Sequence, residues 1–371
     1  MSALQGVLAT GVVGNPEIAF VLGTTPRSVE RWRSGGTDPT RREMLDRLLE
    51  LKSVIDLAVQ TYEPNAAALW IRGPVPALGY DKPLTLIRDG EFKRVIRALE
   101  AGKPAFTSFC QADPETAIAM ATAKYDGIVY EMEHNPWDIR ALRDSLQYML
   151  NRGQIAKSAS VAPGVTPMVR IPPNGSEKAQ FQAKQALDLG VYGIVWPHIS
   201  SVEEAYNAVA ACRYPRRKTA PNYEPAGIRG DGPTSAVRYW GLTQQEYYER
   251  ADVWPLNPKG EIFVILMMED MRGIEALPDI LKKVPGIGAI LIGEGDLSQE
   301  LGYPRQYEHP EVLKWMAQVV ETCKQHNVVV GHPHVDANNV ERVLSESYRF
   351  LMAAPVRSYA ALEKGLKLAG R

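Results

Sequence analysis

Eight short apolar runs beyond residue 103 constrain the fold of this chain more than any other feature. Most of them are separated by amphipathic stretches of helical periodicity, such as residues 178–190 and 309–327. Strands that alternate with helices pair in parallel through crossover connections. Eight such units in about 250 residues predict a (β/α)8 TIM barrel, with a doubly wound sheet as the alternative. The runs are 105–110, 127–131, 167–171, 193–197, 262–268, 289–293, 328–331 and 349–354.

The first hundred residues differ from the rest in chemistry. All six histidines and all three cysteines come after residue 103, so residues 1–102 offer neither imidazole nor thiol for catalysis. We therefore predict a small all-helical domain over residues 1–102 and a catalytic barrel domain over residues 103–371.

A helix-turn-helix outline stands near the start of this helical region. Gly23 lies at a tight bend, and Thr25 before Pro26 is a helix start signal. The second helix carries side chains that suit phosphates or base edges, namely Arg27, Ser28, Arg31 and Arg33. Residues 1–60 hold as many acidic as basic side chains, so the alternative is a solvated face of a small bundle.

A second pattern follows between residues 70 and 102. It consists of Trp70-Ile71, Pro74, Leu78-Gly79, Pro83-Leu84 and a helix with Val95, Leu99 and Gly102. Together with the preceding outline, residues 15–102 resemble the Xre/MbcA/ParS-type antitoxins. That resemblance implies a DNA or protein partner for residues 1–102, or a role in assembly.

Charge and cysteine usage limit the remaining function classes. The net charge is −1, so no overall cationic field attracts nucleic acid or an anionic membrane. Three widely spaced cysteines make no disulfide framework. The longest apolar run, at 262–268, is too short to span a bilayer, and the first residues lack a signal-peptide pattern. We expect a cytoplasmic protein without a membrane partner.

Polar residues follow the carboxyl ends of nearly all the predicted strands, where barrel enzymes build their active sites. Among them, Glu269 and Asp296 end neighbouring strands, and their carboxylates could share Mg²⁺, Mn²⁺ or Co²⁺. The alternative is a pair of solvated or arginine-paired acids. The whole set is Glu131, Glu133, His134, Arg170, Pro197, His198, Glu269, Gly293 to Asp296, His332 and His334.

Five motifs occur in a fixed order along the second region. They are EMEHNPWD at 131–138, VRIP at 169–172, RYP with GIRG at 213–215 and 227–230, Glu269 closing the fifth strand, and GEGDLS at 293–298. In this order they resemble the HpcH/HpaI family of class II pyruvate aldolases over about residues 91–371.

The resemblance implies a carbon–carbon lyase that cleaves or forms 4-hydroxy-2-oxo acids, with pyruvate as the enolate half. Glu269 and Asp296 would hold the divalent metal ion, and Arg170 would face the oxygen that becomes an enolate. His134 would accept the proton of the 4-hydroxyl group, oriented by Glu131 or Glu133.

The resemblance also suggests substrate contacts and assembly. Main-chain N–H groups of Gly295 and Asp296 would hold the substrate carboxylate. Pro197 and His198 are further candidates for substrate contact. His198, His332 and His334 are additional pocket candidates, with a surface or core role as the alternative. The family's trimers and hexamers imply a homo-oligomer.

Four departures from the family pattern stand out. Glu131 replaces a common Asp, and Met267 replaces a common Gln that would offer a polar contact. Two added segments, 216–226 and 241–260, are expected at the active-site or interface face.

Two other functions fit parts of the pattern. A CoA-ester lyase of the citrate-lyase β type shares the barrel and metal carboxylates, although the Glu133-His134 pair favours the aldolase. A DNA-binding regulator could use the barrel as a ligand sensor. Assays of free acids against CoA thioesters, and DNA gel shifts at two salt concentrations, discriminate among them.

Overall fold

A computed structural model gives the structure of most of the chain. The described residues belong to two units, Met1–Phe92 with Arg152–Val161, and Lys93–Asn151 with Ala162–Arg371. The predicted domain boundary after residue 102 lies outside the described residues. Those described are 2–41, 44–45, 47–49, 51–52, 55, 59, 64–72, 84, 103–158, 162–172, 180–353 and 360–370.

Short helices make up the described part of the first unit. They are α1 (Ala3–Ala9), α2 (Asn15–Leu22), α3 (Pro26–Ser34), α5 (Pro64–Arg72) and α10 (Arg152–Ser158). Gly23 ends α2 at a φ of +62°, a left-handed conformation that glycine adopts at little cost. The Thr25 side chain caps α3 by accepting the N–H of Ser28.

This arrangement agrees locally with the predicted pair of helices. Buried Val7, Ile18 and Val29 join α1, α2 and α3 in one apolar core, and Arg27, Arg31 and Arg33 are exposed on α3. The turn at 74–79 and the helix at 95–102 lie outside the described residues, so the antitoxin resemblance stays a prediction.

Eight parallel strands of the second unit form a closed barrel. Strand β1 pairs with both β2 and β9, and β4 pairs with β6, so the eight strands have no free edge. The predicted TIM-type fold is confirmed, with each strand end within one residue of its expected position. The strands are β1 (Ala105–Cys110), β2 (Gly127–Glu131), β3 (Thr166–Arg170), β4 (Gly193–Trp196), β6 (Ile262–Met268), β7 (Ala289–Ile292), β8 (Val329–His332) and β9 (Phe350–Ala353).

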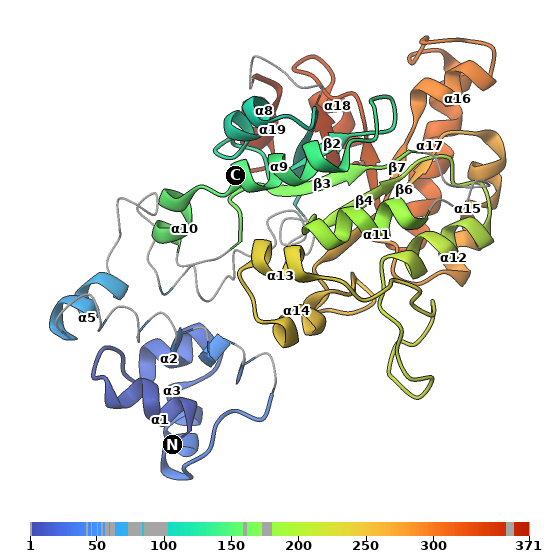
Figure 1. Cartoon of the computed structure of the whole chain (residues 1–371). Coiled ribbons are helices and arrows are strands. Elements are labelled where there is room, and N and C mark those ends of the chain that lie inside the picture. The colour runs from blue at the N-terminus through green and yellow to red at the C-terminus, as the bar shows by residue number, and fades with distance from the viewer. Residues whose placement is uncertain are drawn as a thin grey trace. The chain divides into compact units, whose positions relative to one another are not determined.

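The apolar runs are continuous because the strands are covered on both sides. One set of side chains, including Val129, Val195 and Ile265, fills the barrel interior, while alternate residues pack under the helices. Figure 1 shows α9, α11, α12, α15 and α17 outside the strands. The outer helices are α8 (Pro114–Met120), α9 (Ile139–Met149), α11 (Gln180–Leu189), α12 (Val202–Ala211), α15 (Met271–Lys283), α16 (Glu294–Glu300), α17 (Pro310–Gln325), α18 (Val340–Ser345) and α19 (Ala360–Leu368).

No helix in the described part of the chain has the length and apolar character to cross a bilayer.

The two added segments were expected at the active-site or interface face. They lie at the amino end of β6, so the active-site face was wrong, and the interface stays a prediction. The second includes α14 (Gln244–Arg250) and a short strand, β5 (Val253–Trp254), which pairs with the first residues of β6. The first is tied to it, because the Asn222 side chain donates to the carbonyl of Leu256. Helix α13 (Thr234–Trp240) lies between the two segments. Glu269, by contrast, follows the carboxyl end of β6.

Two buried arginines give the RYP and GIRG motif a structural role. Arg213 Nε donates to Asp252 Oδ1 over 2.8 Å, and its other nitrogens bind carbonyls of the first added segment. Arg229 donates to Asp188 and to the Tyr247 hydroxyl. Arg213 therefore anchors the first added segment, and Arg229 ties α11 to α14 of the second.

Candidate active site

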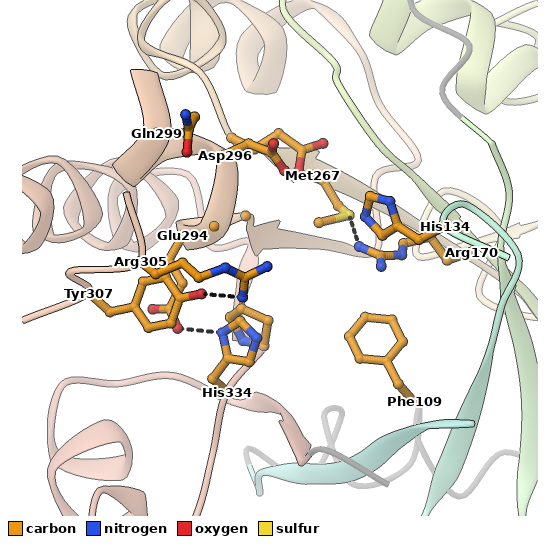
Figure 2. A pocket seen from close by; sticks show the side chains of 14 residues that line it. Phe109, His134, Arg170, Met267, Glu294, Asp296, Gln299, Arg305, Tyr307 and His334 are labelled. Carbon is orange, nitrogen blue, oxygen red and sulfur yellow. Dashed lines mark hydrogen bonds and ion pairs between the residues drawn. The ribbon is translucent and has the colours of Figure 1, made fainter. Parts of the chain in front are cut away.

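A pocket of about 430 Å³ opens at the carboxyl ends of the strands (Figure 2). It brings together eight of the predicted residues, which follow five different strands. Its lining is Phe109, His134, Arg170, Met267, Glu269, Gly293, Glu294, Gly295, Asp296, Gln299, Arg305, Tyr307, Pro333 and His334.

Arg170 is held rigidly at the end of β3. Its Nε donates to Glu131 Oε2 over 2.7 Å, and its Nη1 lies 3.0 Å from Glu133 Oε2. The guanidinium carbon stands 4.6 Å from the ring centroid of Phe109, a cation–π distance. Met267 Sδ contacts Nη1 at 3.7 Å, so the departure at residue 267 still touches the arginine. These contacts leave one face of the guanidinium for the pocket.

Glu131 or Glu133 was predicted to orient the His134 imidazole, and the Glu131 carboxylate makes other contacts. Its second oxygen, Oε1, accepts the main-chain N–H groups of Glu133 and His134 over 2.8 and 3.1 Å. It therefore holds the loop backbone and Arg170, and it does not orient the imidazole. The carboxylate near the ring is that of Glu133, whose Oε2 lies 3.6 Å from His134 Nε2.

His198 lies beside the buried carboxylates. Its backbone adopts a φ of +52°, and its N–H donates to Glu269 Oε1 over 2.5 Å. Its ring nitrogens lie 3.5 Å from Glu133 and 3.7 Å from Glu269. Pro197 is buried next to it, and neither residue is among those that line the pocket.

Burial makes both glutamates hard to ionise. Burial raises the pKa of Glu269 to about 7, opposed by the His198 N–H and reinforced by Asp296. Burial also raises the pKa of Glu133 to about 7, although Arg170 opposes the shift. A cation that bound between such carboxylates would favour their ionised forms.

A comparison with known protein families identifies the family of this chain. The family model described as HpcH/HpaI aldolase/citrate lyase matches residues 109–354. The chain belongs to this family.

Named relatives agree with this membership. The hydroxypyruvate/pyruvate aldolase of Roseobacter denitrificans is 26% identical over 70% of this chain and 89% of that protein. The 5-keto-4-deoxy-D-glucarate aldolase of an Enterobacter species is 28% identical over 65% of this chain and 80% of that protein. An HpcH/HpaI family crystal structure from Burkholderia cenocepacia has a TM-score of 0.56 at 26% identity, covering 72% of this chain and 93% of that one. This HpcH/HpaI protein is an enzyme of the carbon–carbon lyase class.

The donor set of the HpcH/HpaI site fits a divalent cation. Ligand atoms of Glu133, His198 and Glu269 lie within 4.8 Å of one another, and Asp296 lines the same pocket as Glu269. Carboxylate oxygens suit hard cations such as Mg²⁺ and Mn²⁺, and an imidazole suits Mn²⁺ or Co²⁺. Glu269 is common to this trio and to the predicted pair.

Gly293 leaves the space that the Glu269 carboxylate occupies. A Cβ at residue 293 would stand 2.4 Å from both Cβ and Oε2 of Glu269. We expect Gly293→Ala to displace this carboxylate and to weaken Mn²⁺ binding about tenfold or more in calorimetry. Gly295→Ala is the matched control, because a Cβ there meets nothing within 4 Å; equal losses from both changes would contradict the assignment.

The two histidines predicted after the seventh strand lie in different places. His334 lines the pocket, whereas His332 is buried behind it, with Nε2 3.7 Å from Glu294 Oε2.

Other residues of the pocket wall were not predicted from the sequence. Arg305 and Tyr307 come from the connection between α16 and α17, which carries no motif. Only tertiary contacts bring that connection to the pocket.

Proposed function

We propose that this enzyme is a metal-dependent aldolase that cleaves or forms 4-hydroxy-2-oxo acids, with pyruvate as the enolate half. The observation that supports this best is the composition of one pocket. It combines a rigid guanidinium from Arg170, the His134 imidazole and the two acids Glu269 and Asp296.

Glu269 and Asp296 would hold Mg²⁺, Mn²⁺ or Co²⁺ in this proposal. When bound, such an ion acts as a Lewis acid toward the carboxylate and keto oxygen of the 2-oxo acid. Burial raises the pKa of Glu269, and a bound cation would offset this effect because it stabilises the ionised carboxylate.

Arg170 would stabilise the negative charge that develops on the keto oxygen as the carbon–carbon bond breaks. Its position is set before the substrate arrives, because Glu131, Glu133 and Phe109 contact it on three sides. A fixed cation of this kind needs no rearrangement in the transition state.

His134 would take the proton of the 4-hydroxyl group. Its side chain is 66% exposed while that of Glu133 is 3% exposed, so the ring faces the pocket with a buried carboxylate behind it. That carboxylate favours the imidazolium formed when the proton arrives.

The main-chain N–H groups of Gly295 and Asp296 are the proposed contacts of the substrate carboxylate. They belong to the first turn of α16, whose N–H groups have no helical partner. Pro197 and His198, which lie outside the pocket lining, would act through the carboxylates they adjoin.

Assembly and the first unit complete the proposal. By analogy with the family we infer a homo-oligomer, a trimer or hexamer, which light scattering would detect. The α2–α3 pair would serve a DNA or protein partner or support assembly.

A substrate panel tests the function directly. The purified full-length protein is incubated with 4-hydroxy-2-oxo acids, and pyruvate is measured by a coupled assay. We expect release that stops on treatment with EDTA and returns with Mg²⁺, Mn²⁺ or Co²⁺. Cleavage of CoA thioesters in place of the free acids would contradict the proposal and favour a citrate-lyase type of activity.

A further inference from the structure

The proposed reaction moves two protons, and His134 serves one of them. It takes the proton of the 4-hydroxyl group, the carbon–carbon bond breaks, and the enolate of pyruvate remains. A second proton must then reach the methyl carbon before pyruvate leaves. A permanently charged guanidinium cannot supply that proton, and neither can a carboxylate that holds the cation.

His334 is the second imidazole among the residues that line the pocket. It comes from the loop after β8, whereas His134 follows β2. Figure 2 shows the two rings on different sides of the pocket, His134 beside Arg170 and His334 beside Tyr307. Imidazole is the side chain that changes its protonation near neutral pH. The pocket therefore offers one imidazole for each of the two protons.

A buried carboxylate fixes the His334 ring. His334 Nδ1 lies 2.5 Å from Glu294 Oε1, and the Glu294 side chain is 3% exposed while that of His334 is 50% exposed. A carboxylate accepts from a protonated nitrogen, so this contact directs the Nδ1 proton at Glu294 and leaves Nε2 to exchange protons. Glu133 and His134 form the same combination of a buried acid and an exposed ring.

His332 supports Glu294 from the buried side. Its Nε2 lies 3.7 Å from Glu294 Oε2, and its Nδ1 accepts the main-chain N–H of His334 over 3.3 Å. The proton of the neutral ring is therefore on Nε2 and faces the carboxylate. Burial lowers the pKa of His332, which favours this neutral form.

The loop that carries His334 is held at three points. The His334 carbonyl accepts the side-chain N–H of Asn339 over 2.8 Å, and the next N–H, of Val335, donates to the Met352 carbonyl over 2.9 Å. The Tyr307 ring stacks on the imidazole with centroids 5.2 Å apart. A ring held in this way needs little rearrangement before it transfers a proton.

We propose that His334 is a catalytic residue that exchanges a proton with the methyl carbon of pyruvate, and that Glu294 and His332 position it. This inference rests on the proposed aldolase function and adds the residue for its second proton transfer. In cleavage, the electron pair of the broken C3–C4 bond forms the enolate, and C3 then takes the proton of His334 Nε2. The ring is left neutral, with its Nδ1 proton still directed at Glu294.

The addition reaction runs through the same groups in reverse. Neutral His334 Nε2 takes a methyl proton, and the enolate carbon attacks the aldehyde. The 4-oxygen then receives its proton from His134. Each imidazole thus gains one proton and loses one over a complete cycle, by exchange with solvent water.

Exchange of the pyruvate methyl protons in D2O isolates the proposed step, because it needs no aldehyde. We expect His334→Asn to lower the exchange rate about 100-fold or more. Asparagine keeps a side-chain N–H for Glu294 and has no nitrogen in place of Nε2, so the thermal unfolding midpoint and the Mn²⁺ affinity in calorimetry should not change. His326→Ala is the control, since His326 lies outside the pocket lining, and it should exchange at the wild-type rate.

The first turnover of cleavage separates the two protons. With a 4-hydroxy-2-oxo acid, His334→Ala should release aldehyde in a burst of about one equivalent per active site and should release pyruvate slowly. His134→Ala should show the opposite order of effects, with little aldehyde and continued methyl exchange. Free imidazole should restore part of the exchange rate in His334→Ala, which a purely structural role of His334 does not explain.

Three results would overturn the proposal and leave the aldolase function in place. The first is a wild-type exchange rate in His334→Asn. The second is an equal loss of exchange in His134→Ala, which would assign both protons to His134. The third is a loss in His334→Ala that free imidazole does not restore and that comes with weaker Mn²⁺ binding. Absence of both exchange and cleavage in the wild type would instead refute the aldolase function itself.

Discussion

Replacing Glu269 with Gln is expected to reduce metal-stimulated release of pyruvate about 1,000-fold or more. Glutamine keeps the size of the side chain, and its amide oxygen can still accept the His198 N–H that Glu269 accepts. The negative charge is lost, so the fold should persist while the cation is held poorly. Turnover of 4-hydroxy-2-oxo acids, metal binding by calorimetry and the thermal unfolding midpoint measure these three effects.

Matched variants show which residues share the cation with Glu269. Asp296→Asn should weaken metal binding by a similar factor, whereas Glu311→Gln, an exposed acid on α17, should change nothing. His198→Ala tests the trio of Glu133, His198 and Glu269. A larger loss from His198→Ala than from Asp296→Asn would contradict the proposed pair, and unchanged turnover in Glu269→Gln would refute the metal site.

Replacing His134 with Ala is expected to slow cleavage about 100- to 10,000-fold. The change removes the proposed base for the 4-hydroxyl proton and leaves Glu269 and Asp296 in place. Metal affinity should therefore stay at the wild-type value, and exchange of pyruvate methyl protons should continue. His326→Ala is the control, because His326 caps the end of α17 outside the pocket lining.

The paired readouts decide the role of this imidazole. A loss of metal affinity in His134→Ala would make His134 a ligand and not a base. A cleavage rate equal to that of the wild type would remove it from the mechanism altogether.

Sequence patterns were enough to predict the barrel and most of its pocket. A strand covered on both faces reads as an unbroken apolar run, which is why residues 262–268 and 289–292 stood out. Polar residues directly after such runs must lie together, since parallel strands of a closed barrel present their carboxyl ends to one side. Arg170, Glu269 and Asp296 were found in this way.

The same patterns could not predict which atoms each side chain contacts in the folded protein. Either Glu131 or Glu133 was expected at the imidazole, and the pattern could not tell them apart. The Glu131 carboxylate lies against Arg170 and two main-chain N–H groups, and the Glu133 carboxylate is the one near the ring. Arg305 lines the pocket, and its backbone N–H donates to the Ser298 hydroxyl. No spacing rule predicts this contact. The added segments were misplaced because a connection from a helix to the next strand emerges at the amino end of the barrel.

Anomalous diffraction from crystals grown with Mn²⁺ tests the central claim most directly, because it locates the ion without an assay. We predict one peak in this pocket, within coordination distance of carboxylate oxygens from both Glu269 and Asp296. A peak that contacts Glu133, His198 and Glu269 but not Asp296, or the absence of any peak in the pocket, would contradict the account.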